Sequence, residues 1–396
     1  MGTNTWACPA CGAPATTVVY EQDGIPVNSM LLLDEADDAH RFPTASMRLV
    51  LCNGCGFLFN AAFDAELAEY SGRYEASQAY SARFNDFAVG LATRWIQTHD
   101  IRNRTVLEIG CDKGDFLALM CELGPNSGIG VDPAAAASRQ AGSPAADRME
   151  FIADFYDERF GHLDADVVIC RHTLEHIQPV EQFMSTIRRA IGDRTDTLVL
   201  FELPDVVRVL EDLAFWDVYY EHCSYFSLGS LARLFRRTGF EVLHLETDFD
   251  DQYLMIEARP STVPAVGVPL PVEDDLGRIE KAATRFHERC GASIQSWRDG
   301  VRARLGRGER VVIWGGGSKG VAYLSALGFG DALPYAVDIN PHKQGKYLAG
   351  SGVLVVGPEF LTEYEPSLVI AMNPIYCDEI RAELDRLGVA AEVMGA

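Results

Sequence analysis

The sequence predicts an α/β protein with two units of strands and helices, preceded by a small cysteine-rich module. Apolar strand patterns alternate with helical patterns from about residue 103 to 260, and a shorter alternation begins near residue 307. Each unit contains a strand that runs into a glycine-rich loop and then a helix. Two C-x2-C pairs precede both units. The chain of 396 residues is too long for one ordinary core, which agrees with several domains.

The first unit is predicted to be a doubly wound sheet, because its strand patterns are separated by helical ones. The last two strand candidates follow each other closely, which indicates an antiparallel edge. The candidates in chain order are TVLEIG, SGIGVD, MEFIAD, ADVVICRH, TLVLFELP, FEVLHLET and YLMIEARP.

Three further segments are predicted from their patterns. Residues 62–98 are expected to be helical, since apolar positions recur every three or four residues, and they carry Tyr70, Tyr74, Tyr80 and Phe84. Residues 259–275 contain four prolines and are predicted to be a linker, followed by a long polar helix over 276–306. The C-terminal unit is expected to hold three or four strands, fewer than a full dinucleotide fold requires.

The charge of the chain restricts its partners. A formal net charge of −23 argues against a protein that wraps nucleic acid or lies on an anionic membrane, because both usually require a basic face. No secretory signal pattern and no long apolar run is present, so a cytoplasmic location is expected. A small-molecule substrate is favoured, and the expected state is a monomer or a weak homo-oligomer.

Four of the ten cysteines form a metal-binding pattern. Cys8 and Cys11 form one C-x2-C pair and Cys52 and Cys55 form the second, each followed by glycine. This spacing is typical of a tetrahedral zinc site with four thiolates. Four protein ligands leave no open position, so the predicted Zn²⁺ is structural.

The first glycine loop predicts a cationic ligand. Glu108, Gly110, Asp112 and Gly114 follow the first strand, and Asp132 ends the next one, where a carboxylate can meet ribose hydroxyls. Acidic groups would repel a pyrophosphate but attract the sulfonium and ammonium of S-adenosylmethionine. Asp154 and Phe155, after the third strand, are candidates for the adenine. His172 and Glu175 are predicted to buttress the same pocket, although the pair His172 and His176 leaves metal binding conceivable.

The second glycine loop predicts an anionic ligand. Gly315, Gly317 and Gly320 match G-x-G-x-x-G after a strand and before a helix, and Lys319 adds a cation. Gly317, Ser318 and Lys319 are therefore candidates for binding substrate phosphates. Asp338 lies eighteen residues beyond Gly320, so a nicotinamide cofactor remains an alternative ligand.

A stretch dense in aromatic and titratable residues is the candidate catalytic segment. Residues 215–230, FWDVYYEHCSYFSLGS, contain Tyr219, Glu221, His222 and Tyr225. Titratable groups among aromatic rings acquire the perturbed pKa values that proton transfer requires. The segment is therefore a candidate for proton transfer, and Tyr225 is a candidate for the substrate pocket.

These patterns divide the chain into five predicted parts. They are a zinc-binding module, a helical substrate-lining segment, an S-adenosylmethionine-binding Rossmann-like core, a linker with a helix, and a small C-terminal α/β Rossmann-like domain for the nucleotide or phosphate. Their predicted ranges are 1–62, 63–100, 101–260, 261–306 and 307–396.

The four-cysteine module, the E-x-G-x-x-x-G loop, LEHI, YYEHCSYFS and GGGSKG followed by VDINPHKQGKY together resemble the bacterial sugar C-methyltransferases. The resemblance spans nearly the whole chain. It implies a class I methyltransferase core and methylation of dTDP-linked 4-keto deoxysugars in antibiotic pathways. It also implies that Tyr219, Glu221 and His222 surround the substrate, with the histidine as base. Tyr74 resembles a tyrosine that lines the sugar site in this family. Tyr70, in the same segment, is a further candidate for contact with the substrate.

The sequence departs from the family pattern at three places. Asp112 replaces a glycine that is usual in the cofactor loop, Tyr220 stands where many relatives have histidine, and IWGGGSKG is richer in glycine than the GAxAKG form. These differences leave the exact substrate open. The alternatives are an O- or N-methyltransferase of a phosphorylated small molecule, an NAD-dependent oxidoreductase using the second glycine loop, and a non-enzymatic zinc scaffold.

Overall fold

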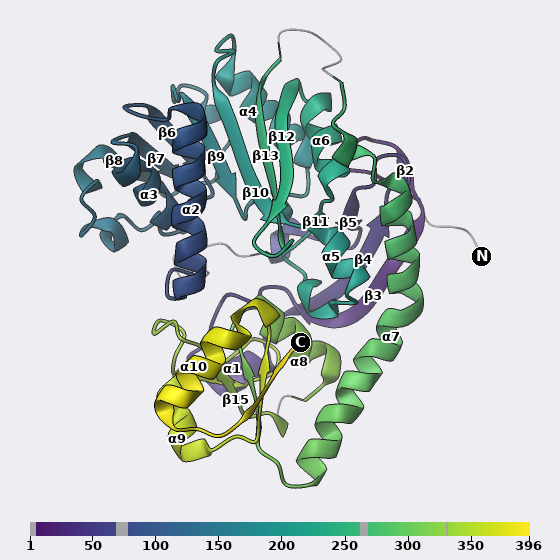
Figure 1. The fold of residues 1–396 in the computed structure, drawn as a ribbon. Coiled ribbons are helices and arrows are strands. Elements are labelled where there is room, and N and C mark those ends of the chain that lie inside the picture. Colours follow the sequence, from purple (N-terminus) through teal and green to yellow (C-terminus); the bar gives the residue numbers. More distant parts are fainter. Residues whose placement is uncertain (1–4, 69–77, 262–267, 330–331) are drawn as a thin grey trace.

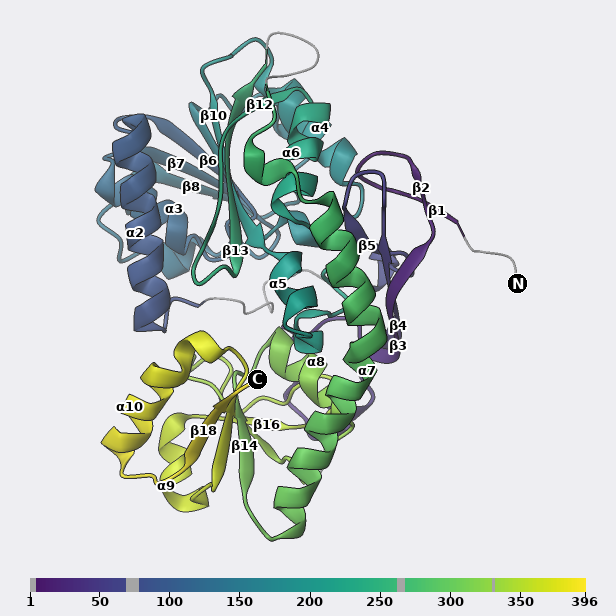
Figure 2. The same ribbon diagram turned by 45° about the vertical axis from the view of Figure 1, so that its right-hand side comes forward.

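A computed structural model describes residues 5–68, 78–261, 268–329 and 332–396 of the chain (Figure 1). It contains a seven-stranded sheet, a four-stranded sheet, a five-stranded sheet and a short two-stranded ribbon. The seven-stranded sheet and the five-stranded sheet lie in separate halves of the molecule, and the four-stranded sheet lies to one side (Figures 1 and 2).

The seven-stranded sheet confirms the predicted strands of the core. Its spatial order is β12-β13-β10-β9-β6-β7-β8. Strands β8, β7, β6, β9 and β10 pair in parallel, whereas β13 pairs antiparallel with both β10 and β12, as the close spacing of the last two candidates predicts. The bounds are β6 Thr105–Ile109, β7 Ser127–Val131, β8 Met149–Ile152, β9 Val167–Arg171, β10 Leu198–Pro204, β12 Phe240–Asp248 and β13 Tyr253–Pro260.

Helices cover both faces of this sheet. On one face, α2 (Ala82–His99) and α3 (Asp115–Leu123) pack Trp95 and Phe116 against each other and against the strands. On the other face, α4 (Val180–Ile191) and α6 (Leu228–Arg237) contribute a second apolar cluster. Two covered faces explain why the central strands are almost continuously apolar.

The predicted helix over residues 62–98 is wrong for residues 62–68 and 78–81, and its residues 69–77 lie outside the described part of the chain. The α-helix begins at Ala82, and within the described residues of this segment a short 3-10 turn at Ala65–Leu67 precedes it. Ser81 is the N-cap of this helix, because its hydroxyl oxygen accepts a hydrogen bond from the Phe84 amide. An apolar periodicity of three to four residues does not show at which residue the helix starts. The predicted contacts Tyr70 and Tyr74 lie outside the described residues.

The four-stranded sheet joins the cysteine module to the core. Strands β3 (Thr17–Pro26), β4 (Thr44–Leu51) and β5 (Leu58–Asn60) form antiparallel pairs, and β11 (Ser224–Tyr225) from the candidate catalytic segment pairs with β5. The ribbon of β1 (Trp6–Ala7) and β2 (Pro14–Ala15) and the short helix α1 (Ala36–His40) complete this region. The catalytic segment is thus also an edge strand of the N-terminal sheet.

The C-terminal unit has five parallel strands, so the expectation of three or four is wrong. Their order is β16-β15-β14-β17-β18, and the last strand, Glu392–Gly395, uses nearly the final residues of the chain. Short strands such as these are easily missed in a sequence. The bounds of the other elements are β14 Val311–Trp314, β15 Tyr335–Val337, β16 Leu354–Val356, β17 Leu368–Ala371, α8 Ser318–Leu327, α9 Leu361–Tyr364 and α10 Cys377–Leu387.

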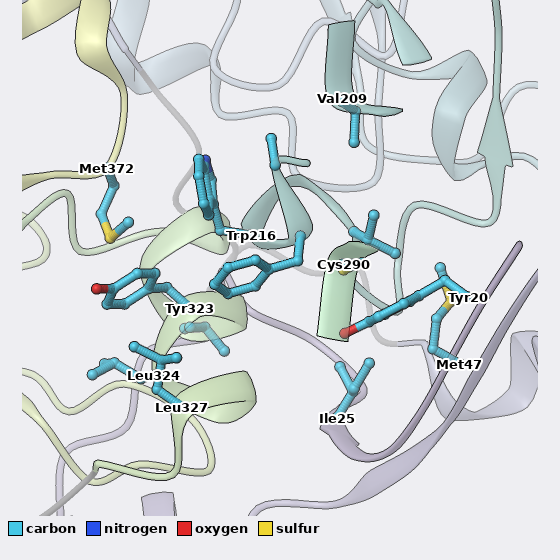
Figure 3. Close-up of a cluster of buried hydrophobic side chains, with 14 of the residues drawn as sticks. Tyr20, Ile25, Met47, Val209, Trp216, Cys290, Tyr323, Leu324, Leu327 and Met372 are labelled. Carbon is cyan, nitrogen blue, oxygen red and sulfur yellow. The ribbon is translucent and has the colours of Figure 1, made fainter. Parts of the chain in front are cut away.

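One apolar cluster links the N-terminal strands, the core and the C-terminal unit. Helix α7 (Leu276–Gly306), which confirms the predicted helix, runs along the side of the molecule between its two halves. In the cluster, Tyr20 and Ile25 of β3 and Trp216, which follows α5 (Val206–Glu211), pack with Tyr323 and Leu324 of α8 (Figure 3). This continuous core positions the two glycine loops relative to each other.

Within the described ranges, none of the helices combines the length and apolarity of a membrane-spanning segment.

Candidate active site

A cavity of about 1270 Å³ lies between the core sheet and the C-terminal unit. Both glycine loops line it, together with the candidate catalytic segment. The loops follow the carboxyl ends of β6 and β14, which is where open α/β sheets bind their ligands. The two loops, which carry opposite charge in the sequence, therefore face a shared space.

The first loop needs its glycines for two reasons. Gly110 has a φ of +74°, and a side chain there would overlap that of Thr173 from the loop after β9. Gly114 has a φ of +84° as the N-cap of α3, and a side chain there would overlap the ring of Phe151. Both residues shape the loop, and of the two only Gly110 is among the described lining residues.

Acidic side chains gather at this end of the cavity. Asp132 accepts hydrogen bonds from the amides of Asp112 at 3.0 Å and Ala134 at 2.6 Å. Burial raises the pKa of Asp132, although these two bonds oppose the shift. Glu108 is buried, and burial raises its pKa to about 8. Its Oε2 atom has no hydrogen-bond partner in the described part of the chain, so a donor on a ligand would satisfy it.

The two adenine candidates lie differently. Phe155 lines the cavity with 56% of its surface exposed. Asp154 is not among the described lining residues and forms an ion pair with Arg159 at 3.0 Å. Hydrogen bonding to Arg159 lowers the pKa of Asp154.

His172 belongs to an ionic network in the wall of the cavity. Its Nε2 atom lies 2.8 Å from Glu202, and Nδ1 lies 3.6 Å from Glu175. Arg171 makes two hydrogen bonds to Glu202, at 2.5 and 3.1 Å, and its guanidinium covers the ring of Phe116 at 4.0 Å. Although burial opposes the charged form, the two glutamates raise the pKa of His172 to about 9. His172 also has a φ of +48°, a left-handed conformation that is uncommon outside glycine.

The second loop is paired with a charge that sequence analysis missed. Lys319 lies 2.9 Å from Asp217 of the catalytic segment, and Asp217 also pairs with Arg208 of α5 at 2.6 Å. All three line the cavity and carry a net charge of about +1 in their usual ionised forms. Only the fold brings α5 to this loop, so no local sequence signal marked Arg208 or Asp217. The excess positive charge and the loop amides suit an anionic group.

Asp338 is engaged within its own unit. Its carboxylate accepts hydrogen bonds from the amides of Gly316 at 2.9 Å and Asn340 at 2.8 Å, and Lys343 lies 3.3 Å away. A ribose diol would have to compete with the Lys343 ammonium and the loop amide for these oxygens. The arrangement is therefore less open than that of a free acidic residue at a dinucleotide site.

The aromatic segment places His222 and Tyr219 in the cavity. The Tyr219 hydroxyl lies 3.0 Å from His222 Nε2, and both residues are buried in the cavity lining. Burial lowers the pKa of His222 far below its usual range, and the positive fields of His176, His172 and Lys319 act in the same direction. The imidazole is therefore neutral at pH 7. Tyr225 lines the same wall, where its hydroxyl contacts the backbone of Tyr219.

Glu221 points away from this pair. Of the residues that the structure describes, the lining includes Tyr219 and His222 but not Glu221. The Glu221 carboxylate accepts hydrogen bonds from both the amide, at 2.8 Å, and the hydroxyl of Ser29. Burial raises the pKa of Glu221 to about 7. Ser29 follows β3 and was missed by sequence analysis, because a serine after a strand carries no signal of its distant partner.

Glu175, His176 and His222 form a compact cluster, with one ligand atom of each within 4.8 Å of the others. The geometry matches a metal site, but the charges around it do not favour a dication. His172, with its pKa raised to about 9, contacts Glu175. Lys319 adds a second positive charge that acts on His222. The cluster therefore suits proton handling better than metal binding.

The four N-terminal cysteines converge as predicted from their spacing. Their ligand atoms lie within 4.8 Å of one another, with Sγ–Sγ separations of 3.7 Å for Cys8 and Cys55 and 3.6 Å for Cys11 and Cys52. A tetrahedron with Zn–S bonds of about 2.3 Å has edges of about 3.8 Å, so the four sulfurs fit zinc. Burial and the neighbouring Cys55 raise the pKa of Cys52 to about 11, so a bound cation is needed to keep this group of thiols ionised.

Asp132 and Asp154 allow a matched test of cofactor binding. We expect Asp132→Asn to weaken S-adenosylmethionine binding about 10-fold or more, because a hydrogen bond to a charged group is lost. Asp154→Asn should change the dissociation constant less than about twofold, since Asp154 is paired with Arg159 outside the described lining. Isothermal titration calorimetry measures both. Equal losses for the two variants would contradict this placement of the cofactor.

The raised pKa of His172 predicts a pH dependence of stability. A folded-state pKa of about 9 exceeds the usual 6.5, so the stabilisation is complete below about pH 6.5 and is lost as pH rises through about 9. The difference corresponds to about 3 kcal/mol. The free energy of unfolding of the wild type minus that of His172→Gln should fall over this range. A histidine NMR titration with a His172 midpoint below 7 would contradict the prediction.

Comparison with known proteins agrees with this geometry. Residues 79–245 match the methyltransferase domain model, and residues 258–391 match the C-methyltransferase C-terminal domain model. The C-methyltransferase NovU of Streptomyces niveus is 29% identical over 393 residues, covering 94% of this chain and 90% of NovU.

Solved structures match a smaller part of the chain. An O-methyltransferase family protein from Burkholderia thailandensis aligns with 20% identity and a TM-score of 0.36, over 45% of this chain and 58% of that protein. A 1,6-didemethyltoxoflavin-N1-methyltransferase from the same organism aligns with 18% identity and a TM-score of 0.34, over 46% and 82%.

The core sheet, with its single antiparallel strand and acidic cofactor loop, and the matching domain model define a class I S-adenosylmethionine-dependent methyltransferase. Within this class, the match to the C-methyltransferase C-terminal domain and the nearly full-length similarity to NovU point to the C-methyltransferases. The chain therefore carries both a methyltransferase domain and a C-methyltransferase C-terminal domain.

Proposed function

We propose that this enzyme methylates the carbon α to a ketone in a nucleotide-linked, dTDP-type deoxy keto sugar, in natural-product biosynthesis. The observation that carries the proposal is the shared cavity, in which an acidic cofactor loop, a neutral histidine and a cationic glycine loop face one another. A substrate with a reactive carbonyl at one end and a diphosphate at the other matches this distribution of charge.

The acidic end would hold the cofactor. Asp132 would accept from the ribose hydroxyls, Phe155 would stack on the adenine, and Glu108 has an oxygen available to a cationic donor. Bound S-adenosylmethionine supplies an electrophilic methyl group on a sulfonium. The neighbouring carboxylates favour this positive charge.

The cationic end would hold the nucleotide diphosphate. Gly317, Ser318 and Lys319 begin α8 at the cavity, and Arg208 adds a second cation through the shared Asp217. Lys319 can approach a phosphate without leaving Asp217, because an ammonium has three donors. The opposite ends of the cavity would thus set the direction of the sugar.

His222 is the proposed base. Its neutral imidazole would take the proton from the α carbon, and the electron pair of that C–H bond would move into an enolate. Tyr219 orients the ring through the 3.0 Å contact, and its hydroxyl can donate to the enolate oxygen. A positioned base contributes about 10²- to 10⁴-fold to the rate.

The domain divisions at residues 62, 100, 260 and 306 remain part of the proposal.

Zinc at Cys8, Cys11, Cys52 and Cys55 would be structural, because none of these residues is in the described lining of the cavity. In this arrangement the module supports the cavity wall through the pairing of β5 with β11.

Solvent exchange tests the reaction type. A dTDP-linked 4-keto-6-deoxyhexose is incubated in D₂O with the enzyme and S-adenosylhomocysteine, and NMR measures deuterium at the α carbon. We expect exchange that requires His222, followed by a new carbon-bound methyl signal when S-adenosylmethionine is supplied. Methyl transfer to oxygen or nitrogen without exchange would favour the O- or N-methyltransferase alternative. Calorimetry with NAD tests the oxidoreductase alternative.

A further inference from the structure

We propose that Ser29 is a positioning residue that couples occupancy of the C-terminal glycine loop to the placement of His222. The inference rests on the proposed function, in which that loop holds the phosphates and His222 is the base. Ser29 lies after β3 in the N-terminal region, so it belongs to neither the glycine loop nor the catalytic segment. It contacts a residue of each.

The contacts form a continuous hydrogen-bond chain. Ser29 is 1% exposed, and its amide and hydroxyl both donate to Glu221 Oε1. The Ser29 hydroxyl oxygen lies 2.7 Å from that of Ser318 in the glycine loop. The Ser29 hydroxyl has one hydrogen for its two contacts, so when it donates to Glu221 the Ser318 hydroxyl donates to Ser29. The chain therefore runs from Ser318 through Ser29 to Glu221, the residue directly before His222.

Ser29 cannot move freely within this chain. The Asn28 side chain accepts hydrogen bonds from the amides of Met30 at 2.9 Å and Leu31 at 3.0 Å, which closes a turn around Ser29. The preceding strand is anchored in the apolar cluster, where Ile25 packs with residues of α8 (Figure 3). The segment is thus a rigid link.

The coupling follows from competition for one hydrogen. When the Ser318 hydroxyl donates to a phosphate oxygen, Ser29 loses a donor and the chain to Glu221 rearranges. Glu221 also holds its neighbours through its backbone, because its carbonyl oxygen accepts from His176 Nδ1 at 3.1 Å. A shift of Glu221 is therefore transmitted to His176 and to the adjacent His222.

Three serine-to-alanine variants test the link. Ser29→Ala removes the middle of the chain and Ser318→Ala removes its end. Ser325→Ala is the matched control, because Ser325 lies on the same helix as Ser318 and accepts from Gln22 of the same N-terminal strand at 3.4 Å. The measurements are α-deuterium exchange with the dTDP-linked 4-keto-6-deoxyhexose, affinity for S-adenosylhomocysteine, and the thermal unfolding midpoint.

We expect Ser29→Ala to slow exchange about 10-fold or more, while Ser325→Ala and the affinity for S-adenosylhomocysteine stay within about twofold of wild type. The double variant Ser29→Ala/Ser318→Ala should lose no more than the larger single loss, because both substitutions break one chain. The inference would be overturned if the double variant lost exchange by the product of the two single losses, or if Ser29→Ala exchanged at the wild-type rate. Either result would leave the proposed function intact. Absence of exchange in the wild type would instead overturn the proposed function beneath it.

Discussion

Replacing His222 with alanine should reduce methyl transfer at least about 100-fold, because a positioned base contributes about 10²- to 10⁴-fold. The neutral imidazole lies in the cavity between Tyr219 and the cluster of His176 and Glu175. Solvent exchange at the α carbon should fall in parallel, since both processes require the same deprotonation. Binding of S-adenosylmethionine should change little.

Two further variants serve as comparisons for His222→Ala. Tyr219→Phe should cause a smaller loss, because the imidazole remains and only its orienting hydroxyl is removed. His244→Ala should have no effect, since His244 is an exposed residue of β12 that pairs with Glu246. Retention of more than roughly a tenth of transfer by His222→Ala, with unchanged substrate binding, would remove His222 from the role of base.

If zinc occupies the four cysteines as proposed, its removal should have the largest effect on stability. Structural zinc contributes about 10–16 kcal/mol to folding in zinc-finger peptides, and four clustered thiols, three of them buried, lose this support without a cation. We expect chelation to unfold the first sixty or so residues. Activity should also fall, because β5 of this region pairs with β11, and the Asn60 amide donates to the Cys223 carbonyl at 2.9 Å, next to His222.

The loss of activity should follow the loss of structure and not precede it. Circular dichroism, zinc content and methyl transfer are measured together during chelation and after zinc is restored. Cys52→Ser should reproduce the defect, whereas Cys377→Ser, at the start of α10, is the control outside the cluster. Loss of transfer while the N-terminal region stays folded would contradict a structural role for the metal.

Local patterns were sufficient wherever one segment carries its own signal. The apolar runs predicted β6 and β7, and the two C-x2-C pairs predicted a four-thiol cluster. The helix over 62–98 was misplaced because Ser81, an N-cap, interrupts a periodicity that continues through it. The C-terminal strands were undercounted because each is only three or four residues long.

Partners from distant segments could not be predicted. Asp217 pairs with Lys319 across 102 positions of sequence, and Ser29 meets Glu221 across 192. The predicted role of Glu221 beside the substrate also depended on which way its side chain points, and the fold directs it towards Ser29.

By itself, the sequence determined the kinds of chemistry present: thiols spaced for zinc, an acidic turn for a cationic cofactor, a glycine loop with a lysine for an anion, and a histidine among tyrosines. These signals are local, because strand patterns, turns and ligand spacing each arise within a few residues. Only the tertiary structure decided that the two loops and His222 share one cavity. Burial and neighbouring charges also act only after folding, and they make His222 neutral and keep His172 charged.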